Sequence, residues 1–171
     1  NLDSYDQQPP WLLPEPFEGE QIAIDNAGLV LLASYLPRLF SVLELTQQRG
    51  FVSFSARSTA VQLLEFLVSG RSDTGEYLWV LNKLLCGLDP ATPVTPQTVA
   101  DQSQQQVCVS LLEGVLANWP GLGGTSVQGL RESFLQRDAV LLFKNDAWHL
   151  TVEPRSFDLL LDRLPWSFSV I

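Results

Sequence analysis

Apolar residues recur at helical spacing along most of this 171-residue chain. The clearest example is the stretch 53–70. Its apolar positions lie three or four residues apart, at Ala60, Leu63, Leu64 and Leu67. That period places them on one face of an α-helix. Ser53 or Ser55 can cap this helix at its start, and Gly70 ends it.

The same pattern predicts several further short helices. They cover residues 28–35, 37–45, 75–87, 96–119, 127–137 and 155–164. Asp25 or Asn26 can cap the first of them, and Pro37 separates it from the second. Thr125, with Gln128 three residues later, fits a capping box at the start of the fifth. The predicted fold is therefore mainly α, a compact bundle of short helices.

One β-hairpin interrupts the helical pattern. Residues 139–143 are a short apolar run, apolar and polar residues alternate over 148–152, and the residues KNDA between them form a turn. Strict alternation places Trp148 on the opposite face from His149, which we expect at the surface. Because a short capped helix leads directly into this hairpin, we expect the C-terminal part to be winged-helix-like.

Residues 1–25 differ in composition from the rest of the chain. They contain six acidic residues and no Lys or Arg, and four prolines accompanied by Trp11 and Phe17. We predict an extended, acidic, Pro-rich strap here that lies on a surface of this chain or of a neighbour. Residues 26–171 then form a single mainly helical domain. The chain has no Met and closes on apolar residues, so we expect both ends to be cut from a longer polypeptide.

The charge of the chain disfavours nucleic acid as a partner. The formal net charge is −9 and the isoelectric point about 4.4, which repels phosphate backbones. In the helix 127–137, helical spacing turns Arg131 into the apolar arc and leaves Arg137 at its edge, whereas Glu132 and Gln136 point outward. We therefore expect Arg131 to bind a carboxylate or backbone carbonyls inside the domain or at a subunit contact.

Candidate chemistry for catalysis or for a cofactor is sparse. Cys86 and Cys108 stand in apolar helical contexts and are expected to be buried free thiols. A single His and two Cys cannot supply a metal-ligand cluster, and no spacing supports a catalytic triad. The acidic pair Asp158 and Asp162 is expected on a solvated helix face. No apolar run approaches the roughly 20 residues that span a bilayer. We predict no enzyme activity, no cofactor, no metal and no membrane span.

Six blocks of the chain together resemble a known family. In order they are NAGLVLLASYLPRLF, LLEFLVSG, EYLWVLNKLLCG, GTSVQGLRESFLQRD, WHLTVE and FDLLLDRLPW. They are similar to the C-terminal region of tape measure proteins of contractile injection systems, which are extracellular phage-tail-like particles. The resemblance covers residues 24–171. The chain departs from the family at Glu65, where His is frequent, and at Gly124, where the family often has Asn.

The resemblance implies a structural role in assembly. Tape measure proteins lie in the lumen of the inner tube and set its length, and their C-terminal end engages the baseplate hub and spike. Residues 26–171 would then be the folded anchor, and the strap would lead into the tube. A threefold hub implies three copies. Such a protein is cytoplasmic during assembly and later lies inside a particle that acts extracellularly.

The segment LPWSFSVI suits a contact with such partners. Trp166 and Phe168 stand at alternate strand positions, where they can add an edge strand or fill a pocket. The complete set of predicted contact residues is Trp11, Phe17, Arg131, Arg137, Trp148, Leu164, Pro165, Trp166 and Phe168. Two other functions stay open at this point: a winged-helix-like nucleic-acid or regulatory module, and an adaptor that loads cargo into the tube.

Overall fold

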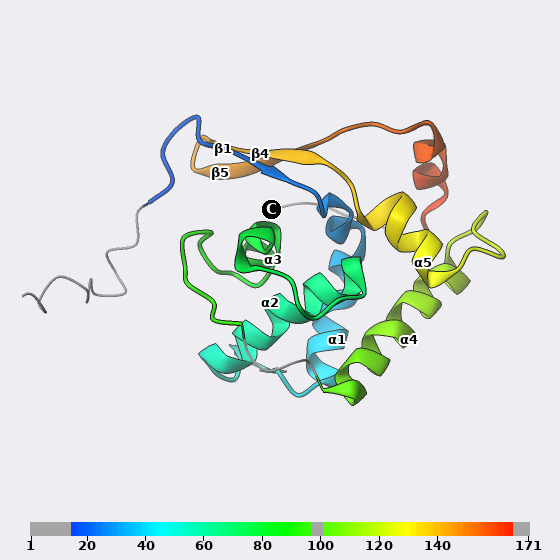
Figure 1. Cartoon of the computed structure of the whole chain (residues 1–171), viewed down its shortest axis with the longest axis horizontal. Coiled ribbons are helices and arrows are strands. Elements are labelled where there is room, and N and C mark those ends of the chain that lie inside the picture. Colours follow the sequence, from blue (N-terminus) through cyan, green and yellow to red (C-terminus); the bar gives the residue numbers. More distant parts are fainter. Residues whose placement is uncertain (1–14, 97–100, 166–171) are drawn as a thin grey trace, which may run out of the picture.

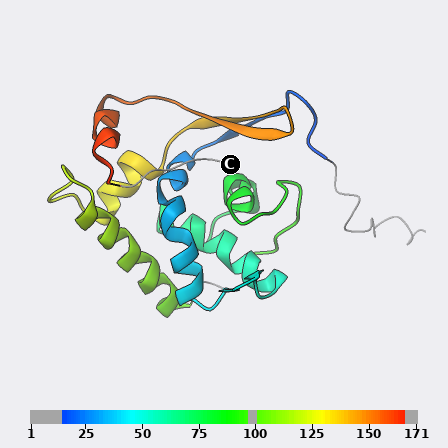
Figure 2. The same cartoon turned by 180° about the vertical axis from the view of Figure 1, so that it is seen from behind.

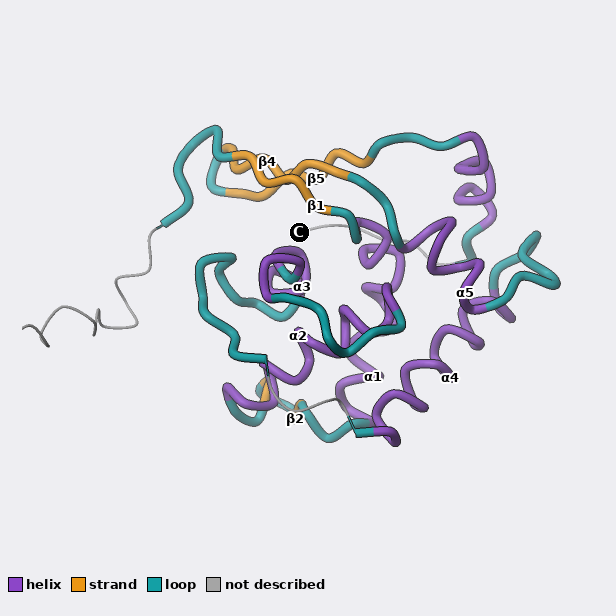
Figure 3. The backbone as a smooth tube through the Cα atoms, viewed as in Figure 1, coloured by secondary structure: helices purple, strands orange, loops and turns teal. Residues whose placement is uncertain are grey.

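Helices form most of the body, and a small sheet lies across one side of them (Figure 1). The computed structural model describes residues 15–96 and 101–165. The fold is mainly helical, as predicted, and contains the expected hairpin. The same division is visible in Figure 3, where the three strands of the sheet occupy one side of the helical body.

Four helical segments enclose the core. They are η2 (Ala27–Tyr35, a 3-10 helix), α1 (Leu36–Val42), α2 (Phe54–Ser69) and α4 (Gln102–Asn118). The four apolar residues that define the face of α2 are completely buried. Ser53 caps this helix by accepting a hydrogen bond from the Ala56 N–H (3.0 Å), and Gly70 ends it at a φ of 70°. Seen from behind, α1 and α4 run side by side (Figure 2).

The start of η2 packs tightly against the backbone of another helical turn. A Cβ atom placed on Gly28 would lie 1.8 Å from the carbonyl oxygen of Phe134. Phe134 belongs to η4 (Arg131–Leu135), a π-helical turn. Only a glycine permits this approach, because any side chain would overlap the backbone of the turn.

Several helix bounds differ from the prediction. The stretch 75–87 is broken into η3 (Glu76–Leu78) and α3 (Val80–Leu85). The helix predicted over 37–45 ends at Val42, and the small hairpin of β2 (Thr46–Gln47) and β3 (Gly50–Phe51), which was not predicted, follows it. These errors arise because local apolar spacing continues past the point where the backbone turns.

The capping box predicted at Thr125 is wrong. Ser126 is the cap, and its Oγ accepts a hydrogen bond from the Gly129 N–H (3.0 Å). The helix that it begins, α5 (Val127–Leu130), is short and continues directly into η4. The last helix, η5 (Ser156–Arg163), is a 3-10 helix.

The sheet has the strand order β1-β4-β5, and all pairs are antiparallel. The strands β4 (Ala139–Lys144) and β5 (Ala147–Val152) are the predicted hairpin. Asn145 and Asp146 both have positive φ (54° and 58°), which is typical of a type I′ turn. The first strand, β1 (Gln21–Ile24), was missed. It pairs with β4, so these residues of the predicted strap belong to the sheet, while residues 1–14 lie outside the described part.

Candidate interaction surfaces

An apolar cleft lies beneath the sheet. Its volume is about 570 Å3, within the roughly 300–1,000 Å3 typical of binding pockets. The sheet side of the cleft is formed by Leu141, Trp148 and the hairpin turn. The opposite wall is contributed by η2, α1, β3 and α3, through Val30, Ala33, Leu36, Pro37, Phe40, Phe51, Leu81, Leu84 and Leu85. Among the described residues that line it, Asp146 is the only charged one.

Arg131 lies inside the domain and caps the C-terminal end of α2. Its Nε donates to the carbonyl of Leu67 (3.0 Å) and its Nη2 to that of Phe66 (3.3 Å). Gln136 completes the cap by donating to the carbonyl of Val68 (3.0 Å). A cation is favourable there, because the last carbonyls of a helix are unpaired and carry its partial negative charge. Burial lowers the pKa of the guanidinium.

Arg137 forms a second internal clamp. It is 3% exposed and binds Asp158 with both Nη atoms, at 2.7 and 2.9 Å. Its Nη2 also donates to the carbonyl of Glu153 (2.8 Å). The pKa of Asp158 is lowered, chiefly by the hydrogen bond from Arg137. The expectation that Asp158 lies on a solvated helix face is therefore wrong, since it joins η5 to the segment before β4.

Both arginines are thus bound within the domain, as the helical spacing indicated. Arg131 donates from Nε and Nη2 to carbonyls, both Nη atoms of Arg137 bind a carboxylate or a carbonyl of the same chain, and neither guanidinium presents itself at the surface. A recognition helix instead directs its cations and amides toward base edges. The observed geometry offers no basis for reading DNA through these two residues.

A buried polar cluster joins η2, α2 and α3. Asn26 donates to Asn82 Oδ1 (2.7 Å), and Asn82 donates to the carbonyl of Val61 (3.0 Å). Glu65 accepts longer hydrogen bonds from both amides (3.4 Å each). Burial raises the pKa of Glu65 to about 7. This cluster was not predicted, because its three polar side chains stand far apart in the chain and meet only through packing.

The remaining predicted contact residues differ in exposure. Phe17 is 67% exposed, Leu164 is half-buried against the core, and Pro165 is exposed. Trp148 is half-buried, faces the cleft and packs on Phe143, with ring centroids 5.2 Å apart. Trp11, Trp166 and Phe168 lie outside the described residues.

A family model described as "Contractile injection system tape measure protein" matches residues 4–171, nearly the whole chain. The chain belongs to this family. No curated protein and no solved structure gives a significant match. Membership in the tape measure family supports a structural role and an association with tube components of the injection system. The family is structural and is not known to be enzymatic.

Other features of this tape measure protein bear on its chemistry. Cys86 and Cys108 are free and buried, and burial raises the pKa of each thiol to about 12. Over residues 15–96 and 101–165, no group of three or more His, Cys, Asp and Glu side chains is arranged to hold a metal ion. None of the described helices is long and apolar enough to cross a membrane.

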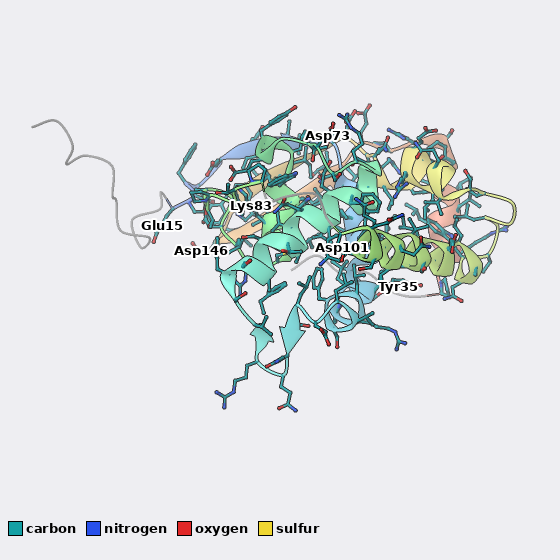
Figure 4. The ribbon with its side chains drawn as sticks, turned by 60° about the horizontal axis from the view of Figure 1, so that its bottom comes forward. Glu15, Tyr35, Asp73, Lys83, Asp101 and Asp146 are labelled. Carbon is teal, nitrogen blue, oxygen red and sulfur yellow. The ribbon has the colours of Figure 1, made fainter. Side chains whose placement is uncertain are left out.

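The tape measure domain has a second apolar surface at the opposite end from the sheet. A groove of about 320 Å3 runs between α1 and α4, and Val42 on its rim is 56% exposed. Nearby, Val52 and Phe54 are also exposed. The hairpin of β2 and β3 projects from the body beside them, as the cyan arrows in Figure 4 show. Exposed apolar side chains that gather in this way are typical of contact surfaces.

Proposed function

We propose that residues 26–171 are the anchor of a tape measure protein that sets the length of the inner tube. The family match over residues 4–171 is the observation that carries the proposal. In this arrangement the anchor binds the baseplate hub and spike of a phage-tail-like particle, and the part of the acidic strap that precedes β1 leads into the tube lumen. Three copies assemble on a threefold hub. Assembly takes place in the cytoplasm, and the particle acts outside the cell.

The surface chemistry of the domain is compatible with anchoring. Two apolar grooves and several exposed apolar side chains are available for burial against a partner. The buried arginines and the net charge of −9 both oppose an alternative role on nucleic acid. Phe17 and the apolar residues near the two ends of the chain, Trp11, Trp166 and Phe168, are the proposed contacts.

Deletion within the gene tests this role. Removal of residues 26–171 should abolish baseplate initiation, so that electron micrographs show no complete particles. Shortening any part of the protein that precedes residue 26 should instead give complete particles with shorter tubes. Particles of normal length after the deletion of residues 26–171 would refute the anchor.

A further inference from the structure

The outer edge of β5 is open. The strand pairs with β4 on one side, and no described residue pairs with it on the other. The Glu153 N–H donates to the carbonyl of Asp138 (2.9 Å), which continues the ladder between the two strands. Backbone groups of successive residues point to opposite edges of a strand. Those of Thr151 therefore face β4, whereas those of Leu150 and Val152 face the open edge.

The apolar cleft lies below the same strand. Trp148 and Ala147 of β5 line it, and Leu84 and Leu85 of α3 form the facing wall. In Figure 1, α3 lies directly beneath the sheet. A strand added to β5 would direct alternate side chains to this inner face and the others to the solvent. The cleft and the edge together therefore fit an extended segment whose apolar residues occupy every second position.

Residues 166–171, WSFSVI, have this pattern. Trp166, Phe168 and Val170 alternate with Ser167 and Ser169. Trp and Phe each bury roughly 150–250 Å2 of surface, so two of them suit a large apolar cleft. The polar serines suit the outer face.

The segment follows η5, whose Phe157 ring lies 5.2 Å from that of Phe134. Phe134 in turn touches Gly28 at the start of η2. Two residues further along η2, Val30 lines the cleft. Six extended residues span about 20 Å, and Figure 1 shows η5 beyond the end of the sheet at which β5 finishes. A chain returning from η5 therefore runs antiparallel to β5.

We propose that residues 166–171 of the same chain add to the open edge of β5 as a fourth, antiparallel strand. Trp166, Phe168 and Val170 face the apolar inner side of the sheet, and Ser167 and Ser169 face outward. The chain itself supplies this occupant, because a tethered segment has a far higher effective concentration than one from another molecule. The inference does not depend on the anchor role. It means that a hub that binds Trp166 and Phe168 has to displace them from their own domain.

Residue-resolved amide hydrogen exchange on the whole chain tests the added strand. In the unmodified chain the amides of Leu150 and Val152 should exchange at least ten times more slowly than exposed loop amides. The double substitution Trp166→Asp and Phe168→Asp should remove this protection. The matched double substitution Ser167→Asp and Ser169→Asp places the same charges on the outward positions and should leave the protection within twofold.

The Thr151 amide is the internal control for folding. It faces β4, so it should remain slow in the chain and in both variants. Fast exchange at Leu150 and Val152 in the unmodified chain would overturn the proposal. The proposal would also fail if Thr151 stays slow and Leu150 and Val152 remain protected after the Trp166 and Phe168 substitutions. If the Trp166→Asp and Phe168→Asp variant unfolds, exchange in the unmodified chain and in the Ser167→Asp and Ser169→Asp variant decides whether the strand forms.

Dilution identifies the source of the strand. Protection at Leu150 and Val152 that is independent of protein concentration supports an occupant from the same chain. Protection that is lost on dilution, together with a monomer–oligomer transition in sedimentation, contradicts it and indicates the segment of a second copy. Either result leaves the particle experiments on anchoring unaffected, so failures of the two proposals are distinguishable.

Discussion

Two sides of the domain differ in whether their binding groups are already occupied. One side is held together by Arg131 and Arg137, and the other is covered by the sheet. Arg131 donates to carbonyls at the C-terminal end of α2, and Arg137 binds the Asp158 carboxylate and the Glu153 carbonyl of the same chain. On the sheet side, a cleft of about 570 Å3 and an unpaired strand edge stay open among the described residues. The contrast indicates that the charged residues hold the fold, while the apolar side offers the binding capacity.

The largest expected effect on stability is at Gly28, which packs against the backbone of Phe134 on the arginine side of the domain. In Gly28→Ala the new Cβ overlaps the backbone of Phe134, so we expect a loss of about 3 kcal/mol or more in the free energy of unfolding. Gly114→Ala is the matched control. Gly114 lies in α4 with nothing within 4 Å of an added Cβ, so alanine should stabilise by roughly 0.5–1 kcal/mol. Urea denaturation measures both. Equal effects of the two substitutions would contradict the tight packing at η2.

The second largest loss of stability is expected when Arg137, which clamps Asp158 and Glu153, is removed. Arg137→Ala removes the cation from the Asp158 carboxylate, which keeps the Arg155 N–H, and the donor from the Glu153 carbonyl, at a cost of about 3 kcal/mol. Arg71→Ala removes a similar two-bond contact to Asp73, but both side chains are exposed there, so no measurable change is expected. Thermal unfolding of both variants compares them directly. A similar fall in Tm for the two would show that burial does not set the strength of the clamp.

The buried Glu65 carboxyl predicts a pH dependence of stability. Its pKa rises from 4.5 to about 7 on folding, so the folded state holds the proton more tightly. Stability from this group is then full below about pH 4.5 and is lost as the pH rises through 7, by about 2 to 3 kcal/mol between pH 5 and 8. Glu65→Gln should remove this decline, whereas Glu113→Gln, on an exposed glutamate, should retain it. Denaturant midpoints measured between pH 5 and 8 test this prediction. An equal decline of stability with pH in both variants would exclude Glu65 as its source.

The smallest expected effect is in the hairpin turn on the sheet side. Asp146 has a φ of 58°, which glycine adopts more readily than an L-residue with a side chain. Asp146→Gly should therefore stabilise by roughly 0.5 kcal/mol. Asp146→Val, with a β-branched side chain in the same conformation, should destabilise. Chemical denaturation measures the change in the free energy of unfolding for both variants. A change of the same sign in both would contradict the type I′ assignment.

Much of the helical architecture was predictable from local pattern. The apolar face of α2, its serine cap, its glycine end and the β4–β5 hairpin all depend on residues within a few positions of one another. The breaks in the stretch 75–87 and after Val42 were not predictable, because apolar spacing continues through them. The strand β1 was hidden in a Pro-rich, acidic segment, since its pairing partner lies more than a hundred residues away.

The sequence by itself determined that this chain is mainly helical, that Arg131 turns inward, and that it belongs among the tape measure proteins. These follow from short-range periodicity and from the order of the six sequence blocks that resemble the family. Only the tertiary structure decided which carbonyls Arg131 caps, that Asp158 pairs with Arg137, that Glu65 is buried, and that a cleft opens beneath the sheet. Each of these depends on side chains from elements far apart in the chain, whose meeting is fixed by packing rather than by local propensity.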